Sequence, residues 1–346
     1  MRKILVILLV ALALLGAACG NDDNGGGNAK KKAAGPSGAQ TYDVDMDADA
    51  SPQYQVAAYY PGQLTVRPGD TIVFNNKSKV HPHTVTFGIK ADQSNRPAAI
   101  TAKGEENPVA FAPCFTDTEA SPQLAACPSK ADPANPPAYA GRGFWSSGIL
   151  SAAAGPAAPA KITLKLADSI APGNYSYVCM LHPFQAGSIK VAATDGDRLT
   201  PAAVRTSAEA SAKKAVADTS SLKAPAATAG TVTAGWGDRI TAVMAYDPAA
   251  LNVKVGDTVT WKDASPYEPH TVTFESMFKT PGDPGATAPA GVKSGGTYTN
   301  GFTSSGLFGP QPFFESNTFS LTFAKAGTYN YVCTIHPGQK GTVTVA

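Results

Sequence analysis

The chain contains one segment twice, and this internal repeat limits what it can fold into. Residues 175–192 read YSYVCMLHPFQAGSIKVA and residues 329–346 read YNYVCTIHPGQKGTVTVA, with ten of the eighteen aligned positions identical. A second pair of matching segments lies upstream: HPHTVTF ends at Phe87 and EPHTVTF ends at Phe274. Each half of the chain therefore offers one Cys, two His and one Gln at matching positions.

The repeated side chains form a distinctive set of metal donors. A thiolate with two imidazoles and a weak fourth ligand is the donor set of a type 1 copper site. Copper alternates between a harder Cu(II) and a softer Cu(I), so a site that holds both needs mixed donors with little freedom to rearrange. The Cys-x-x-His spacing places two donors on one loop, which Pro183 and Pro337 stiffen by fixing φ. The sequence thus predicts one copper site in each half.

Short alternating segments separated by Gly and Pro predict an all-β chain. Residues 64–76 (LTVRPGDTIVFNN) and 251–263 (LNVKVGDTVTWKD) both read as strand, turn and strand. HTVTF strands at 83–87 and 270–274, a Gly-aromatic-x-Ser-Ser-Gly element and the YxYVC strand follow in the same order in both halves. This pattern predicts two Greek-key β-sandwiches in tandem, joined by a linker with a short helix.

Length and composition fit two domains with linkers. The 346 residues exceed the usual size of one domain, and a formal net charge of +2 gives no reason to expect a nucleic-acid partner. Thr200 and Pro201 are suited to the N-cap and first turn of a helix that runs to about Ala217. We expect a signal peptide at 1–18, a flexible tether at 19–41, a first domain at 42–195, a linker at 196–230 and a second domain at 231–346.

The N-terminus has the form of an export signal. Arg2 and Lys3 supply positive charge, residues 4–15 form an apolar run too short to span a bilayer, and residues 16–18 are small. Cys19 follows directly, so the segment resembles a bacterial lipoprotein signal, whose Cys is lipidated after cleavage, although Gly16 stands where such signals usually have Leu. We expect a membrane-anchored lipoprotein on the outer face of the cell membrane or in the periplasm. Plain secretion, with Cys19 as a free thiol, is the alternative.

Two further cysteines lie outside the repeat and the signal. Cys114 and Cys127 are close together in a Pro-rich insertion that only the first half contains. An exported protein meets oxidising conditions, under which nearby cysteines form disulfides. We therefore expect a Cys114–Cys127 disulfide, with two free thiols on the inserted loop as the alternative.

Both halves resemble the cupredoxin family of type 1 blue copper proteins. The motifs that carry the resemblance are GDTIVF and GDTVTW, PHTVTF in both halves, and YSYVCMLHPFQAG and YNYVCTIHPGQKG. Within the family, the amicyanin-like members are the most similar. The resemblance implies two coppers per chain, bound by His83, Cys179 and His182 in the first half and by His270, Cys333 and His336 in the second.

The fourth ligand position departs from the amicyanin-like pattern. Where those proteins have Met three residues after the loop His, this chain has Gln185 and Gln339, which resembles stellacyanin-type cupredoxins. An amide oxygen is a harder donor than a thioether and favours Cu(II). Many cupredoxins also have Asn after the upstream His; here Thr84 and Thr271 take that place, and their hydroxyls are candidates for tying the two ligand segments together.

One His lies outside the four in the repeat. His81 stands where the second half has Glu268. We expect His81 on the surface near the first site rather than among the ligands.

The small number of His residues argues against a copper enzyme. A trinuclear oxygen-reducing centre of the laccase type needs more than the five His of this chain, and copper nitrite reductases use a His beside the type 1 Cys. Here the neighbours of the two cysteines are Val178, Met180, Val332 and Thr334.

We expect an electron carrier that serves unidentified redox partner proteins. A copper-binding or copper-delivery protein, and a non-redox interaction module with empty sites, are the alternatives; with five Met in total, the Met-rich tracts that would favour delivery are absent.

Overall fold

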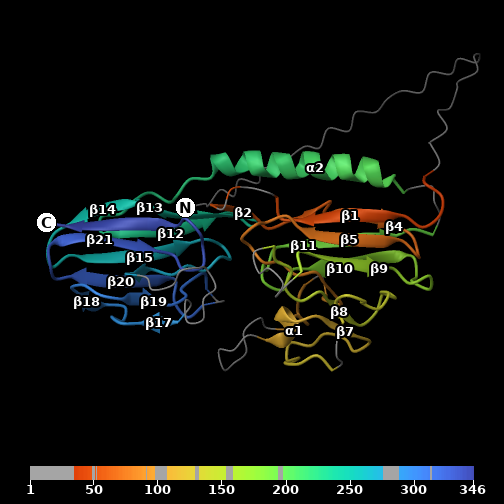
Figure 1. Cartoon of the computed structure of the whole chain (residues 1–346), viewed down its shortest axis with the longest axis horizontal. Helices are drawn as coiled ribbons and strands as arrows, with labels where there is room; N and C mark the ends of the chain where they lie inside the picture. The colour runs from red at the N-terminus through yellow and green to blue at the C-terminus, as the bar shows by residue number, and fades with distance from the viewer. Residues whose placement is uncertain are drawn as a thin grey trace, which may run out of the picture. The chain divides into compact units, whose positions relative to one another are not determined.

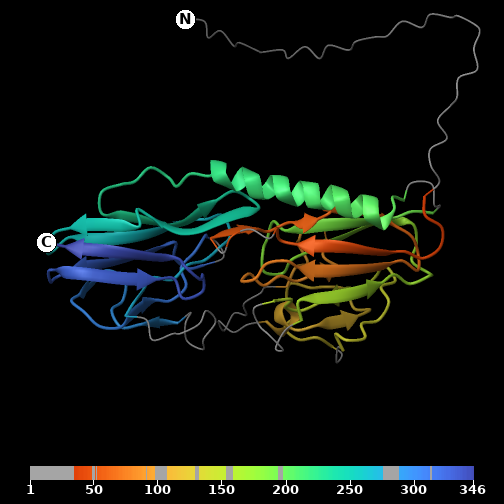
Figure 2. The ribbon, with the colours of Figure 1, turned by 45° about the horizontal axis from the view of Figure 1, so that its top comes forward.

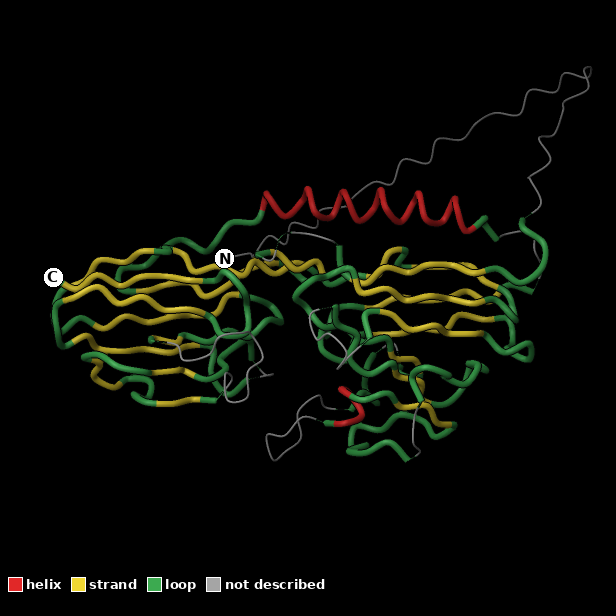
Figure 3. The backbone as a smooth tube through the Cα atoms, in the orientation of Figure 1, coloured by secondary structure: helices red, strands yellow, loops and turns green. Residues whose placement is uncertain are grey.

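The computed structural model describes residues 35–48, 51, 53–90, 92–97, 107–128, 132–152, 159–193, 198–275, 288–311 and 314–346. The expected signal peptide at 1–18, the expected lipidation site Cys19 and the tether up to residue 34 lie outside the described residues. Strands make up most of the regular secondary structure in the described part, and one long helix runs along the outside of the sheets (Figures 1 and 3).

The first sandwich consists of a four-stranded and a six-stranded sheet, and all of its strands come from the first half of the chain. One sheet has the order β3 (Tyr59–Tyr60), β1 (Thr41–Met46), β5 (Thr71–Asn76), β9 (Lys161–Lys165). The other has the order β4 (Gln63–Val66), β11 (Ala186–Val191), β10 (Gly173–Val178), β6 (Thr86–Phe87), β8 (Phe144–Ser146), β7 (Cys114–Thr116).

The second sandwich repeats this plan with two six-stranded sheets. One sheet has the order β18 (Gly296–Tyr298), β20 (Thr318–Phe323), β15 (Thr258–Ala264), β12 (Thr231–Gly237), β13 (Thr241–Asp247), β2 (Tyr54–Val56). The other has the order β14 (Ala250–Val253), β22 (Lys340–Val345), β21 (Gly327–Val332), β16 (Thr273–Phe274), β19 (Thr303–Ser305), β17 (Pro289–Ala290).

Crossed connections confirm the predicted Greek-key class. β1 pairs in parallel with β5, and β12 pairs in parallel with β15 at the equivalent place. β4 with β11 and β14 with β22 form a second equivalent parallel pair. Strands that are distant in sequence therefore lie side by side, as two packed sheets with Greek-key connections require.

Alternation along the strands directs one face of each sheet into a core. In β5 and β20 every second residue is buried, which is the period-two pattern of a half-covered sheet. Aromatic rings fill both cores at equivalent positions: the ring of Tyr177 lies 5.2 Å from that of Phe74, and the ring of Tyr331 lies 5.2 Å from that of Trp261. Both core tyrosines stand two residues before the repeated Cys, so core packing fixes the strand that leads to it.

The predicted linker helix is present as α2 (Pro201–Asp218), followed by the short η3 (Thr219–Ser221). The Thr200 hydroxyl accepts the Ala203 N–H at 3.2 Å, which caps the helix as the sequence predicts. Ala208 of α2 packs in a small apolar cluster with Val56 of β2 and Tyr60 of β3, and the helix also lies against β1 (Figure 2). In the described part of the chain, no helix is long and apolar enough to cross a membrane.

One strand of the first half belongs to the second sandwich. β2 pairs antiparallel with β13, where Val56 stands opposite Thr241. The Ala57 N–H extends the ladder by donating to the Ile240 carbonyl at 2.6 Å. Backbone hydrogen bonds therefore join the two sandwiches directly, which the repeat in the sequence did not predict.

The insertion of the first half carries its own small apolar cluster. It contains α1 (Pro108–Phe111), and Val109 and Ala110 pack with Phe144 and Met180. Cys114 and Cys127 form a disulfide there, as expected from the sequence.

Two expectations about the residues around the upstream His were wrong: the full HTVTF strands at 83–87 and 270–274, and the surface position of His81. Only Thr86–Phe87 and Thr273–Phe274 form ladders in the HTVTF segments, because the backbones of His83 and His270 make isolated bridges to Leu150 and Phe308. His81 is not on the surface: it is 5% exposed, because its ring faces Asp47 of the first sandwich and His336 of the second.

A buried Asn and a buried Asp occupy equivalent positions in the two sandwiches. Asn76 accepts the Ser78 N–H through its Oδ1 at 2.9 Å and donates from its Nδ2 to the carbonyls of His81 and Leu150 at 2.8 and 2.7 Å. Asp263 accepts the Ser265 N–H in the same way at 2.6 Å, but its Oδ2 is buried with no hydrogen-bond partner in the described structure. Burial, aided by the charge of Glu268, raises the pKa of Asp263 to about 8.

Replacing Asp263 with Asn should stabilise the protein at alkaline pH. Because the pKa in the folded state exceeds the ordinary value of about 3.9, the Asp263 contribution is full below that value and is lost as the pH rises through 8. Asp263→Asn removes this loss and supplies a donor, so the free energy of unfolding at pH 9 should rise by about 1–3 kcal/mol.

Denaturant unfolding at pH 5, 7 and 9 measures this difference, and Asn76→Asp is the matched control that should destabilise the protein most at pH 9. A lower stability of Asp263→Asn at pH 9 would contradict the interpretation.

Candidate metal centres

The first centre brings together four donor atoms from two parts of the first sandwich. His83 lies just before β6, and Cys179, His182 and Gln185 lie on the loop from β10 to β11. The Cys179 Sγ is 3.3 Å from the His182 Nδ1, and the Gln185 Oε1 lies 2.8 Å from the His83 Nδ1 and 3.3 Å from the His182 Nδ1. All four side chains are buried. The thiol, two ring nitrogens and an amide oxygen therefore converge.

The second centre repeats this arrangement closely. The Cys333 Sγ is 3.4 Å from the His336 Nδ1. The Gln339 Oε1 lies 3.0 Å from the His270 Nδ1 and 3.2 Å from the His336 Nδ1. In each centre the possible donor atoms of the two His and the Cys lie within 4.8 Å of one another, and no other such group occurs among the described residues.

The orientation of both Gln amides is set by hydrogen bonds on the far side. The Gln185 Nε2 donates to the Ala58 carbonyl at 3.3 Å, and the Gln339 Nε2 donates to the Ala245 carbonyl at 3.2 Å. Because the nitrogen is committed to a carbonyl, the oxygen faces the two imidazoles. Each Gln thus turns its amide oxygen, a possible metal donor, toward the two imidazoles.

The surroundings of the thiols favour the thiolate. Burial alone would raise the pKa of Cys179, but the charge and hydrogen bond of His182, together with His83, hold it well below its ordinary value. The pKa of Cys333 is lowered in the same way by His336 and His270. Backbone N–H groups add to this effect: the Thr84 N–H donates to the Cys179 Sγ at 3.3 Å and the Thr271 N–H to the Cys333 Sγ at 3.4 Å.

The Thr hydroxyls tie the two ligand segments of each centre together. The Thr84 Oγ1 accepts the Met180 N–H at 2.7 Å, and the Thr271 Oγ1 accepts the Thr334 N–H at 2.8 Å. The donors are the residues directly after Cys179 and Cys333. A hydroxyl in place of the more common Asn therefore joins the upstream His segment to the Cys loop.

The inserted segment of the first half borders the first centre. The Gln93 Nε2 donates to the Pro183 carbonyl at 2.9 Å, and the Arg96 guanidinium donates to the Cys179 carbonyl at 3.1 Å. These bonds hold the loop that carries Cys179 and His182 from outside.

The two centres differ behind the upstream His. The His83 Nε2 lies 3.2 Å from the Asp47 carboxylate, whereas the His270 Nε2 is buried with no hydrogen-bond partner in the described structure. Gly235 lies against His270, and a Cβ at that position would stand 2.0 Å from the Nε2. Asp47 and Gly235 both have positive φ, 62° and 76°. The two sandwiches thus have the same backbone bend at this place, but the bend carries a carboxylate at the first centre and no side chain at the second.

No sequence motif predicted the polar residues that surround the ligands. Asp47 contacts His83, and Glu268 lies 3.1 Å from the His182 Nε2 and 3.5 Å from the His336 Nε2. The only signal for Glu268 was its place before the repeated Pro-His, opposite His81 in the alignment of the halves. Burial would raise the pKa of Glu268, but its hydrogen bonds to both imidazoles hold it well below the ordinary value.

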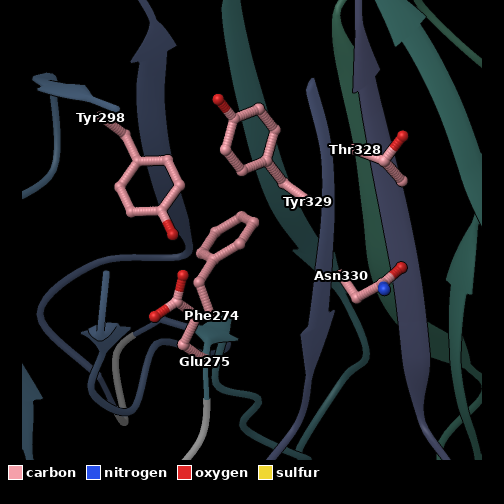
Figure 4. A pocket seen from close by; sticks show the side chains of 6 residues that line it. All are labelled: Phe274, Glu275, Tyr298, Thr328, Tyr329 and Asn330. Atoms are coloured by element: carbon pink, nitrogen blue, oxygen red, sulfur yellow. The ribbon is translucent and has the colours of Figure 1, made fainter. Parts of the chain in front are cut away.

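A pocket lies elsewhere in the second sandwich, away from the donor atoms. It has a volume of about 240 Å³. Figure 4 shows its lining side chains, which are Phe274, Glu275, Tyr298, Thr328, Tyr329 and Asn330. Glu275 accepts the Gly301 N–H there at 3.2 Å, and the Tyr329 hydroxyl donates to the Lys325 carbonyl at 2.8 Å. These polar groups serve the local backbone, and the pocket shares no residue with either centre.

The donor set fits copper. A thiolate, two imidazole nitrogens and a weaker oxygen donor match the preferences of both oxidation states of copper. Buried hydrogen bonds hold both Gln amides and three of the four imidazoles, those of His83, His182 and His336, from behind, as is usual for ligands of protein-bound metals. The structure therefore supports two candidate copper sites, one in each sandwich.

Comparisons with known proteins agree with this arrangement. A model of copper binding proteins of the plastocyanin/azurin family matches residues 234–346. The chain is 36% identical over 106 residues to amicyanin of Paracoccus denitrificans, which covers 30% of this chain and 60% of that protein. It is 31% identical over 104 residues to plastocyanin of Scenedesmus fuscus, which covers 30% of this chain and 87% of that protein.

A solved structure of a mutant of amicyanin, Cu(I), is 29% identical to this chain. The match covers 35% of this chain and 86% of that one, with a TM-score of 0.23. The two centres, the Greek-key sandwiches and the plastocyanin match together assign this chain to the cupredoxins, the family of copper-binding proteins that includes plastocyanin and azurin.

Proposed function

We propose that the protein is an exported one-electron carrier with two type 1 copper sites, anchored to a membrane through a lipid on Cys19. The observation that carries the proposal is the convergence, in both sandwiches, of a thiol, two imidazole Nδ1 atoms and an amide oxygen. When bound, copper supplies one-electron redox chemistry. The export signal and the lipidated Cys rest on the sequence pattern at residues 1–19.

The chain's own residues suit electron transfer because they restrain the donors. Thr84 and Thr271 lock the Cys loops, and the Gln amides are held by the Ala58 and Ala245 carbonyls. A restrained donor set changes little between oxidation states, which keeps the energy needed for rearrangement small. Because Gln offers oxygen rather than sulfur, both centres should favour the oxidised metal.

Burial of the ligands argues against the alternatives. His182 is 6% exposed and His336 is 4% exposed, so a metal acceptor protein has no direct access to the ligand loops. A delivery protein would have to open the site. A purely structural module would have no need of two complete and buried donor sets, because unmatched polar groups in a core cost stability.

Among the described residues, no second kind of metal centre accompanies the two donor sets, so nothing there supports a copper enzyme. Four of the five His belong to the two donor sets, and the fifth, His81, contacts the Asp47 carboxylate at 3.5 Å. The electron donor and acceptor would be separate proteins. Because both loop imidazoles face the junction of the two sandwiches, such partners would approach the centres from other sides.

Copper content and colour test the proposed function directly. The purified protein should bind two coppers per chain and, when oxidised, show an intense thiolate-to-copper absorption band. Cys179→Ala and Cys333→Ala should each remove one copper and about half of this band, because each variant loses the thiolate of one centre. Metal analysis with absorption spectroscopy measures both. Binding of a single copper, or of two without the band, would defeat the two-site proposal.

The axial Gln residues should hold the reduction potential down. Gln339→Met replaces an oxygen donor with a thioether, which favours Cu(I), so the potential of the second centre should rise. A shift of about 59 mV corresponds to a tenfold change in the one-electron equilibrium. Electrochemistry on Gln339→Met and on its counterpart Gln185→Met measures the two centres in turn. If neither potential changes, the Gln oxygens are not ligands.

Asp47 should make the first centre the more reducing of the two. Its carboxylate accepts the His83 N–H and enriches the imidazole in electrons, which stabilises the oxidised metal. Asp47→Asn keeps the Oδ1 that accepts the Val56 N–H and suits the positive φ, yet it removes the charge.

The potential of the first centre should therefore rise by roughly 59 mV or more, a tenfold change in equilibrium, while the second stays unchanged. Asp45→Asn, a partly exposed charge change two residues earlier in β1, is the control. Equal shifts in both variants would exclude a specific role for Asp47.

A further inference from the structure

One carboxylate lies between the two candidate copper sites. Glu268 belongs to the second sandwich, two residues before His270, and its side chain is buried. Its Oε1 lies 3.1 Å from the Nε2 of His182 in the first sandwich. Its Oε2 lies 3.5 Å from the Nε2 of His336 in the second. Each oxygen thus faces one loop imidazole, and the two imidazoles belong to different centres.

The contacts are made at the ring nitrogens that point away from the thiols. In both imidazoles the Nδ1 faces the Cys sulfur and the Gln oxygen of its own centre. A neutral imidazole has one N–H donor and one acceptor nitrogen. A carboxylate beside the Nε2 keeps the proton on that nitrogen and leaves the Nδ1 lone pair for a metal.

We propose that Glu268 positions the metal-binding imidazoles of both centres and thereby links the two copper sites into one coupled unit. The inference rests on the proposed function, because it concerns the residues that would bind copper. The imidazoles of His182 and His336 share the negative charge of the Glu268 carboxylate. A change of charge at one centre therefore alters the hydrogen bond that this carboxylate accepts from the imidazole of the other centre. A residue of the second sandwich is thus part of the environment of the first centre.

The difference between the two halves at this position supports a single shared carboxylate. The first half has His81 where the second has Glu268, and the His81 ring lies 6.4 Å from that of His336. A second Glu at residue 81 would place two buried carboxylates at the same junction, and like charges there repel. His81 instead contacts the Asp47 carboxylate through its Nδ1 at 3.5 Å. The pairing of Glu with His lets the two halves meet without a clash of charges.

Other contacts hold the two sandwiches together without Glu268. β2 forms a backbone ladder with β13, and the Arg239 guanidinium lies 5.0 Å from the centre of the Phe184 ring across the same junction. The Gln55 side-chain amide of β2 also lies 3.0 Å from the His182 Nε2, where its oxygen, turned toward the ring, would share that N–H with Glu268. A substitution at residue 268 therefore removes the shared carboxylate while the ladder and the Phe184 contact remain.

The sharpest test measures the first centre in a protein whose second centre lacks its thiolate. In the full chain with Cys333→Ala, Glu268→Gln should weaken the affinity of the remaining centre for Cu²⁺ roughly 10- to 100-fold, as expected when the partner of a ligating His is lost. The Nε2 proton of His182 should also exchange faster with solvent in NMR spectra, because a neutral amide holds it less strongly. Zn²⁺ titrations of the same proteins measure the metal affinity of the first centre without redox chemistry. The test therefore remains valid even if the protein proves not to transfer electrons.

The matched control is Glu315→Gln, which removes an exposed carboxylate of the second sandwich in the same background. Glu268→His copies the residue of the first half and should weaken the first centre as Glu268→Gln does, which guards against a folding defect peculiar to Gln. Unfolding midpoints of all variants are compared. An unchanged affinity and an unchanged His182 proton in both Glu268 variants would overturn the link while leaving the two copper sites in place.

Discussion

Both centres depend on one hydrogen bond. In each, the backbone N–H of the residue after the Cys donates to the hydroxyl of the Thr that follows the upstream His. It joins the Thr84 Oγ1 to the Met180 N–H, and the Thr271 Oγ1 to the Thr334 N–H. The two partners belong to segments far apart in the sequence, and the surrounding sheets bring them together. Because the thiol and the upstream imidazole are fixed on the two sides of this bond, the donor geometry depends on the fold rather than on the metal.

The cores extend this constraint outward from the loops. Tyr177 and Tyr331 pack with aromatic residues of the facing sheet, and each stands two residues before the Cys of its centre. The Cys loop therefore begins from a strand whose side chains are fully packed. Interiors packed this closely deform little, so the ligands are held even where they themselves contribute little to stability.

The junction between the sandwiches turns two similar halves into an asymmetric pair. Asp47 has a carboxylate beside His83, whereas Gly235 leaves His270 without one, and Glu268 faces a loop imidazole of each centre. The imidazole edges of His182 and His336 are buried there. Two centres built from the same donors thus have different surroundings, which is the physical basis for different properties.

The sequence by itself determined the local chemistry. Period-two alternation, Gly-Asp turns and the repeated Cys-x-x-His loop predicted the sandwiches, the donor residues, the Cys114–Cys127 disulfide and the helix after Thr200, because each depends on neighbouring residues or on the repeat. Tertiary structure alone decided the pairing of β2 with the second sandwich, the burial of His81 and the shared position of Glu268. These features arise where the halves meet. A repeat shows that two units are alike, but their contact depends on side chains that differ between them, such as His81 and Glu268, and no local pattern encodes which of these face each other.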